Sequence, residues 1–250
     1  PNSRWYTGCG IYRHVYLSKS TDVRVAEWGV QAISEVKKGV GHVTLNTQIE
    51  NFSGRSRRVT VRQKLWNKAR QLVTQASKTC DVAVSGTTVK QQMRVPKPQL
   101  WSPASPNLYT ITTEIIENGR VLDGDTIRMG MRTVAFDAKQ GFFLNGKNMK
   151  INGVCLHGDL GCLGAAINED ALYRQVSMMK AMGANAIRCS HNPPAPELLN
   201  LCDSLGMLVV DEAFDSWLHG KTPFDYSLHF KTWFERDLRD MVLRDRNHPS

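Results

Sequence analysis

The sequence lacks the features that define several common classes of protein. No apolar run approaches the roughly 18 residues of a membrane-spanning helix, so no membrane span is expected. The six cysteines include no CxxC pair, and Cys155 and Cys162 stand too far apart for a zinc knuckle. We therefore expect buried, reduced thiols rather than a disulfide framework. No P-loop, GxGxxG, HExxH or GxSxG motif occurs, so phosphate, dinucleotide, zinc-protease and serine-hydrolase chemistry have no support.

Acidic residues are missing from one stretch of the chain. Residues 51–80 contain eight Lys or Arg and no acid, whereas the remainder has 24 basic and 23 acidic residues, which accounts for the net charge of +9. In this stretch Val59, Val61 and Leu65 share one parity with Gln63, and the opposite parity is basic. The alternation predicts a half-buried strand with a solvated basic face, with an anion-binding role as the alternative. No recognition helix or base-stacking motif accompanies the charge, so nucleic acid is not an expected partner.

The first half of the chain has the pattern of a β-sandwich. Seven short runs of alternating apolar residues are separated by Gly, Asn, Ser and Pro, without a helical period. They span residues 22–36, 42–51, 57–67, 79–86, 87–95, 108–119 and 126–136. The tetrapeptides NFSG and ENGR between runs resemble hairpin turns.

After residue 137 strands alternate with helices. A hairpin is predicted at Asn145-Gly146, followed by strands that end near His157, near Arg188 and near Asp211. Helices are expected from an Asn168 cap to Gly183, from Pro196 to Gly206, and over residues 229–245. Such alternation implies a parallel sheet with right-handed crossovers, either a (β/α) barrel or a doubly wound sheet. Three strand–helix units are present, fewer than a closed barrel of about 250 residues requires.

Helical spacing predicts which side chains of these helices face a core. The inward positions are Leu172, Val176, Met179 and Met182 in the first helix, Leu198, Leu201, Cys202 and Leu205 in the second, and Phe230, Phe234, Leu238, Met241 and Val242 in the third.

Polar residues follow each of the three predicted parallel strands. His157 follows the first strand, residues 188–192 close the second, and Asp211 and Glu212 close the third. Because ligands of parallel α/β folds bind at the carboxyl ends of the strands, these side chains form a candidate polar pocket for a hydroxyl-rich ligand. Structural caps and buried ion pairs remain the alternative. Phe214 and Trp217 would either stack on a sugar or pack in the core.

The stretch NAIRCSHNPPAPELLNLCDSLGMLVVDE resembles the sequence signature of glycoside hydrolase family 2, the family of β-galactosidases and β-glucuronidases. Three further stretches resemble the family over nearly the whole chain. These are SRWYTGCGIYRHVYL, similar to the close of its jelly-roll domain, LWSPASPNLYTI of its sandwich, and GMRTVAFDAKQGFFLNGKNMKINGVCLHGDLG at the entry to its barrel.

The resemblance implies an order of domains and a mechanism. Residues 1–20 would be the remnant of a jelly-roll sugar-binding domain, 21–137 an immunoglobulin-like β-sandwich, and 138–250 the first part of a (β/α)8 TIM barrel. It also implies a retaining mechanism with two Glu side chains about 5–5.5 Å apart. Both would lie beyond Ser250, so we expect no catalytic residue in this chain and an inactive fragment. The alternative is a non-catalytic carbohydrate-binding or scaffold module.

The resemblance also assigns roles to individual residues. His157 and His191 match sugar contacts, and Asn192 stands where many members of the family have Tyr. Arg188, Asp211 and Glu212 match residues that support the pocket, and an ion pair between Glu212 and Arg188 would serve structure alone. The supporting role of Arg188 would rest on charge-assisted hydrogen bonds to carboxylates.

The positions of the family's magnesium ligands depart from the pattern. Asp215 and Trp217 stand there, and because an indole cannot coordinate magnesium, neither a metal nor another cofactor is expected. The expected partner is a β-glycoside, with β-galactoside as the first choice of substrate. The sequence leaves the oligomeric state and the compartment open.

Overall fold

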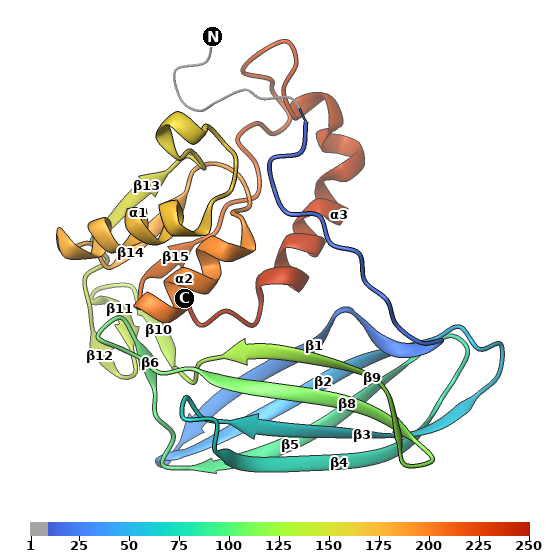
Figure 1. The fold of residues 1–250 in the computed structure, drawn as a ribbon. Coiled ribbons are helices and arrows are strands. Elements are labelled where there is room, and N and C mark those ends of the chain that lie inside the picture. The colour runs from blue at the N-terminus through green and yellow to red at the C-terminus, as the bar shows by residue number, and fades with distance from the viewer. Residues whose placement is uncertain (1–9) are drawn as a thin grey trace. The chain divides into compact units, whose positions relative to one another are not determined.

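The computed structural model describes residues 10–250, which divide into two compact units (Figure 1). One unit comprises residues 10–16, Met149–Arg246 and Ser250, and the other comprises Leu17–Asn148 and Asn247–Pro249. The predicted domain limits at residues 20 and 137 remain a prediction. Part of the jelly-roll assignment falls on residues 1–9, which lie outside the described residues.

The unit of residues Leu17–Asn148 and Asn247–Pro249 is a β-sandwich of two antiparallel sheets. One sheet has the order β1 (Val23–Lys37), β2 (Val40–Asn51), β5 (Thr87–Pro96), and the other the order β4 (Leu72–Val82), β3 (Arg57–Trp66), β8 (Tyr109–Glu117), β9 (Arg120–Met129). Shorter strands follow: β6 (Trp101–Ser102) pairs with β7 (Ser105–Pro106), and β10 (Val134–Asp137), β11 (Gly141–Leu144) and β12 (Lys147–Asn148) form a small sheet. Seven long strands in two sheets confirm the predicted sandwich.

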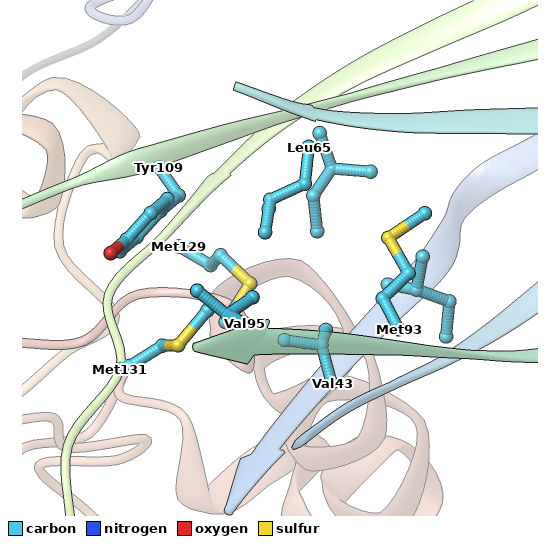
Figure 2. Close-up of a cluster of buried hydrophobic side chains, with 9 residues drawn as sticks. Val43, Leu65, Met93, Val95, Tyr109, Met129 and Met131 are labelled. Carbon is cyan, nitrogen blue, oxygen red and sulfur yellow. The ribbon is translucent and has the colours of Figure 1, made fainter. Parts of the chain in front are cut away.

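Alternate side chains of the two sheets meet in the core. Figure 2 shows Leu65 of β3 and Tyr109 of β8 in one buried cluster with Val43 of β2 and Met93 of β5. Each fully buried aliphatic or aromatic side chain contributes about 1.5–3 kcal/mol to folding. The predicted inward parity of β3 is confirmed, and the buried Gln63 amide is satisfied because it donates to Thr47 Oγ1 and Thr113 Oγ1, each at 3.0 Å.

The basic stretch is paired with acids from neighbouring strands. Arg62 Nε donates to Glu114 Oε2 at 2.7 Å, and Arg58 lies 3.3 Å from Asp81. Arg57 forms an ion pair with Glu117, which raises the pKa of Arg57 and lowers that of Glu117 through their hydrogen bond. These cross-strand pairs favour the solvated-face interpretation over an anion site.

Two of the three predicted hairpin turns are confirmed. ENGR joins β8 to β9 with positive φ at Asn118 and Gly119, and the Asn145-Gly146 turn joins β11 to β12 in the same conformation. The NFSG prediction is wrong, because β2 and β3 belong to different sheets. There the buried Asn51 amide donates to the carbonyls of Arg55 and Val82, so it fixes a crossing between sheets.

The other unit, called the barrel unit below, contains residues Met149–Arg246. It is built on a parallel sheet in the order β13 (Gly153–Leu156), β14 (Ala186–Cys189), β15 (Leu208–Val210). The 3₁₀-helix η1 (Gly161–Leu163) and α1 (Glu169–Ala181) connect the first two strands, α2 (Pro196–Leu205) connects the next two, and α3 (Ser227–Asp245) follows (Figure 1). Asn168 Oδ1 caps α1 by accepting from Ala171 N, Pro196 opens α2, and Gly206 ends α2 in the left-handed conformation. These features confirm the predicted alternation of parallel strands with helices.

One face of this sheet is covered by α1 and α2. Leu172 and Val176 of α1 pack with Ile187 of β14 and with Leu198 and Cys202 of α2. The prediction of which helix side chains face the core is wrong at three positions, since Met182, Leu238 and Val242 are exposed. Met182 lies past the last turn of α1, and α3 is buried at Phe230 alone.

The cysteines of the described residues are all free. Cys189 and Cys202 are buried, as expected, and burial raises the pKa of Cys189 to about 12. The expectation of burial is wrong for Cys155 and Cys162, which are exposed, while Cys9 lies outside the described residues. Within residues 10–250 no helix is long and apolar enough to cross a membrane.

Candidate functional site

Successive side chains along each parallel strand point to opposite faces of the sheet, so every second side chain faces away from α1 and α2. Val154, Ile187 and Val209 point into the helix-packed core, and their neighbours Cys155, Arg188 and Val210 form a row across the opposite face. This row is exposed in the described residues. The candidate site is built on it, at the carboxyl ends of the three strands.

An ion pair and a hydrogen bond join two of these strands. Arg188 Nε contacts Glu212 Oε1, and His191 Nδ1 lies 2.8 Å from Glu212 Oε2, so both oxygens of one carboxylate are used. Arg188 Nη1 also lies 3.4 Å from Ser190 Oγ. Glu212 thus holds an arginine and a histidine in fixed positions.

The same contacts determine which nitrogen of His191 carries the proton. Nδ1 lies 2.8 Å from Glu212 Oε2 and 3.4 Å from Arg188 Nη2. A carboxylate only accepts hydrogen bonds and a guanidinium only donates, so the shorter contact assigns the proton to Nδ1. In the neutral ring Nε2 is therefore an acceptor, and in the imidazolium it is a donor.

A second histidine completes the cluster. The ring of His157, which follows β13, lies edge-on to that of His191, with centroids 5.7 Å apart and an interplanar angle of 86°. The structure therefore brings together His157, Arg188, His191 and Glu212 from all three strands. These groups offer donors and acceptors in fixed directions, as the recognition of hydroxyl groups requires.

Two predicted site residues do not join this cluster. Asp211 has the opposite parity to Glu212 and faces Asp245 of α3. Burial, and then the neighbouring Asp245 carboxyl, raise the pKa of Asp211 to about 7, and its Oδ1 is buried without a hydrogen bond. Asn192 is exposed on the loop after β14.

The loop after Glu212 is ordered by an aromatic cluster. Phe214 stacks on Tyr226 with centroids 4.8 Å apart, and Trp217 stacks on Phe230 at 5.8 Å. Phe214 therefore packs against the protein, whereas Trp217 is 63% exposed. Asp225 accepts hydrogen bonds from Ser227, Thr222 and Lys221, which hold its pKa well below the usual value.

The position matched to a magnesium ligand is occupied by an ion pair. Asp215 Oδ1 lies 2.8 Å from Lys221 Nζ. In the part of the chain that the structure describes, no three His, Cys, Asp or Glu side chains are grouped as metal ligands. The expectation of a pocket without metal stays a prediction.

Sequence reasoning missed Cys155 as a neighbour of the site. Its thiol lies 3.8 Å from Arg188 Nη1, and hydrogen bonds with Ser190 and Arg188 lower its pKa. The alternation of side chains along β13 could have revealed it, because Cys155 lies between the partly buried Val154 and Leu156 and pairs with Arg188 in the parallel register.

Comparison with known proteins assigns a family to both units. The sequence model of the TIM barrel domain of glycosyl hydrolases family 2 matches residues 136–250, and a second model of glycosyl hydrolases family 2 matches residues 23–132. The chain is 48% identical to the β-galactosidase BoGH2A of Bacteroides ovatus, over 100% of this chain and 30% of that protein.

Solved structures agree in fold over nearly the full chain. A glycosyl hydrolase family 2 member from Bacteroides cellulosilyticus matches with a TM-score of 0.96 and 39% identity, over 99% of this chain and 32% of that one. A β-glucuronidase from Bacteroides uniformis matches with a TM-score of 0.79 and 28% identity, over 92% of this chain and 28% of that one.

The chain therefore spans about a third or less of these relatives' length. Its sandwich, its parallel strands and its strand-end residues all fall within the matched regions. The chain thus belongs to glycoside hydrolase family 2 and contains the family's immunoglobulin-like sandwich and the first part of its TIM barrel.

Proposed function

We propose that this chain forms one wall of the sugar pocket of a retaining β-glycosidase that removes terminal β-galactosyl residues. The observation that carries the proposal is the cluster of His157, Arg188, His191 and Glu212 at the carboxyl ends of three parallel strands. The 48% identity to a protein named as a β-galactosidase supports the choice of sugar.

In this proposal the two histidines bind substrate. His191, with its proton held on Nδ1 by Glu212, presents Nε2 to a sugar hydroxyl, and His157 lies beside it. Asn192 on the exposed loop supplies a further amide contact. Such contacts favour catalysis when they tighten as the sugar approaches the transition state.

Arg188, Glu212 and Asp211 support the pocket rather than react. Both Glu212 oxygens are engaged by Arg188 and His191, and Asp211 is half-buried beside Asp245. A retaining mechanism requires one carboxylate to attack the anomeric carbon and a second to donate and then remove a proton. We assign both of those roles to Glu residues outside residues 1–250.

The first test is hydrolysis by the full-length protein. We expect it to release para-nitrophenol from the aryl β-galactoside faster than from the β-glucuronide or β-glucoside, and to release the β-anomer first, as proton NMR detects. Faster cleavage of the β-glucuronide would overturn the choice of sugar. Absence of cleavage of every aryl β-glycoside would overturn the enzymatic proposal and favour a carbohydrate-binding module.

The second test uses residues 1–250 alone. Because the proposal places both catalytic carboxylates elsewhere, we expect no turnover of aryl β-glycosides above a sample without protein. Turnover clearly above that control would show that the catalytic groups lie within these residues. The reading frame past Ser250 offers an independent check, since we expect a strand followed by Asn-Glu there.

A further inference from the structure

The loop that carries His191 and Asn192 has few hydrogen-bond donors of its own. Pro193 and Pro194 follow Asn192 directly, and proline has no backbone N–H. This part of the loop can be fixed through its carbonyl oxygens, which require donors from elsewhere in the chain. The next helix, α2, begins at Pro196, so it adds a third residue without a donor.

Arg13 supplies donors from a distant part of the sequence. Its Nη2 donates to the carbonyl of Pro193 at 2.8 Å, and Nη1 lies 3.5 Å from the carbonyl of Pro194. The residues beside it make further contacts within the same unit. Ile167 N donates to Tyr12 O at 3.0 Å, and His14 Nε2 lies 3.7 Å from Glu197 Oε1 at the start of α2.

Arg244 of α3 approaches the same loop from another element. Its Nη2 donates to the carbonyl of Pro194 at 2.9 Å. Asp245 accepts from Arg244 Nε and Nη2, each at 2.6 Å, which fixes the plane of the guanidinium. Both members of this pair are largely buried, with side chains 18% and 10% exposed, so water competes little for these hydrogen bonds.

We propose that Arg13 and Arg244 are positioning residues, which clamp the carbonyls of Pro193 and Pro194 and so fix His191 and Asn192 against the substrate. The clamp rests on the proposed function, because its benefit is correct placement of sugar contacts. A planar guanidinium suits the task, since it donates in several fixed directions at once. Loss of the clamp moves the loop, and a displacement of about 1 Å at a binding residue lowers catalysis by up to about 100-fold.

A measurement independent of catalysis tests the clamp itself. In full-length protein carrying Arg13→Ala, we expect the amides of residues 188–192 to exchange hydrogen for deuterium faster than in the wild type. Arg174→Ala is the matched control, because Arg174 is an exposed arginine on α1 of the same unit. Equal exchange in wild type and Arg13→Ala would overturn the clamp, whether or not the protein cleaves glycosides.

Kinetics then test whether the clamp acts through His191. We expect Arg13→Ala to lower kcat/KM for the aryl β-galactoside by about 10- to 100-fold, with partial recovery in Arg13→Lys, which retains one donor. In a His191→Ala background the same substitution should have little further effect, since the contact it positions is gone. If Arg13→Ala lowered kcat/KM by the same factor with and without His191→Ala, the clamp would not act through His191.

The same experiment separates the two proposals. A wild-type protein that cleaves no β-glycoside overturns the proposed function, while hydrogen exchange still decides the clamp. A wild-type protein that cleaves the β-galactoside, together with an Arg13→Ala variant of unchanged kcat/KM and unchanged exchange, overturns the clamp and leaves the proposed function standing.

Discussion

Two neighbouring carboxylates meet opposite environments in this structure. Glu212 lies on the site face, where Arg188 and His191 contact its two oxygens, whereas Asp211 points toward α3 and the acidic Asp245. The difference follows from the alternation of side chains at the end of β15. At Asp211, burial and the neighbouring carboxyl group therefore favour the protonated form.

The raised pKa of Asp211 predicts a dependence of stability on pH. Its pKa is about 7 in the folded chain against an ordinary 3.8, so between these values the folded state holds a proton that the unfolded state releases. The free energy of unfolding therefore falls as the pH rises through this window, and the loss is complete above it.

We expect Asp211→Asn, which cannot ionise, to reduce the loss of stability between about pH 5 and about pH 8, measured by urea unfolding. Glu235→Gln, a change at an exposed acid on α3 of the same unit, serves as the control. An unchanged pH dependence in Asp211→Asn would contradict the raised pKa.

Residue-level prediction succeeded where contacts follow from strand order. The sequence placed His157, Arg188, His191 and Glu212 at the ends of adjacent strands, and the structure brings them together. It did not foresee the contact of Arg13 with Pro193, which joins residues 180 positions apart. The spacing of apolar residues within one helix or strand cannot predict such a contact, because the contact depends on how distant elements pack.

At the scale of elements, caps and turns explain the boundaries. Asn168 accepts from Ala171 N at 2.9 Å, and Glu169 and Asp170 place negative charge in the first turn of α1. Gly206 ends α2 with a φ of 75°, a backbone conformation that is unfavourable for residues with a Cβ atom. These local signals are strong, so the sequence located the helices well.

The cap of α1 provides a prediction for stability. Asn168→Ala leaves the first-turn amide without its acceptor, so we expect the free energy of unfolding of the chain to fall by about 1 kcal/mol. Asn168→Ser retains a capping oxygen, so we expect it to lower the free energy of unfolding by only a small part of this amount. Equal stabilities of the Ala and Ser variants, measured by urea denaturation, would show that the side chain contributes nothing as a cap.

Strand prediction was weaker where a strand has little apolar alternation. The starts of β4 at Leu72 and of β9 at Arg120 were missed, because the first residues of both strands are exposed or half-buried. These two strands lie at the edges of their sheet, so they need fewer apolar side chains than β3 or β8. The central strands were located from alternation alone.

At the scale of the whole molecule, each unit has its own core. The sandwich buries two clusters between its sheets, and the barrel unit buries one beneath α1 and α2. The chain spans about 30% of the length of its relative BoGH2A. In the proposed function, the described barrel strands supply one part of a pocket and the catalytic carboxylates lie outside these residues.

The most direct test of the proposed wall of the sugar pocket is kcat/KM of the full-length His191→Ala variant for the aryl β-galactoside. His229→Ala, a change at an exposed histidine on α3, is the matched control. If His191 holds a sugar hydroxyl that tightens in the transition state, kcat/KM falls by about 100-fold or more relative to wild type and to the control. A value equal to that of the wild type would contradict the account, because the histidine would then serve the fold alone.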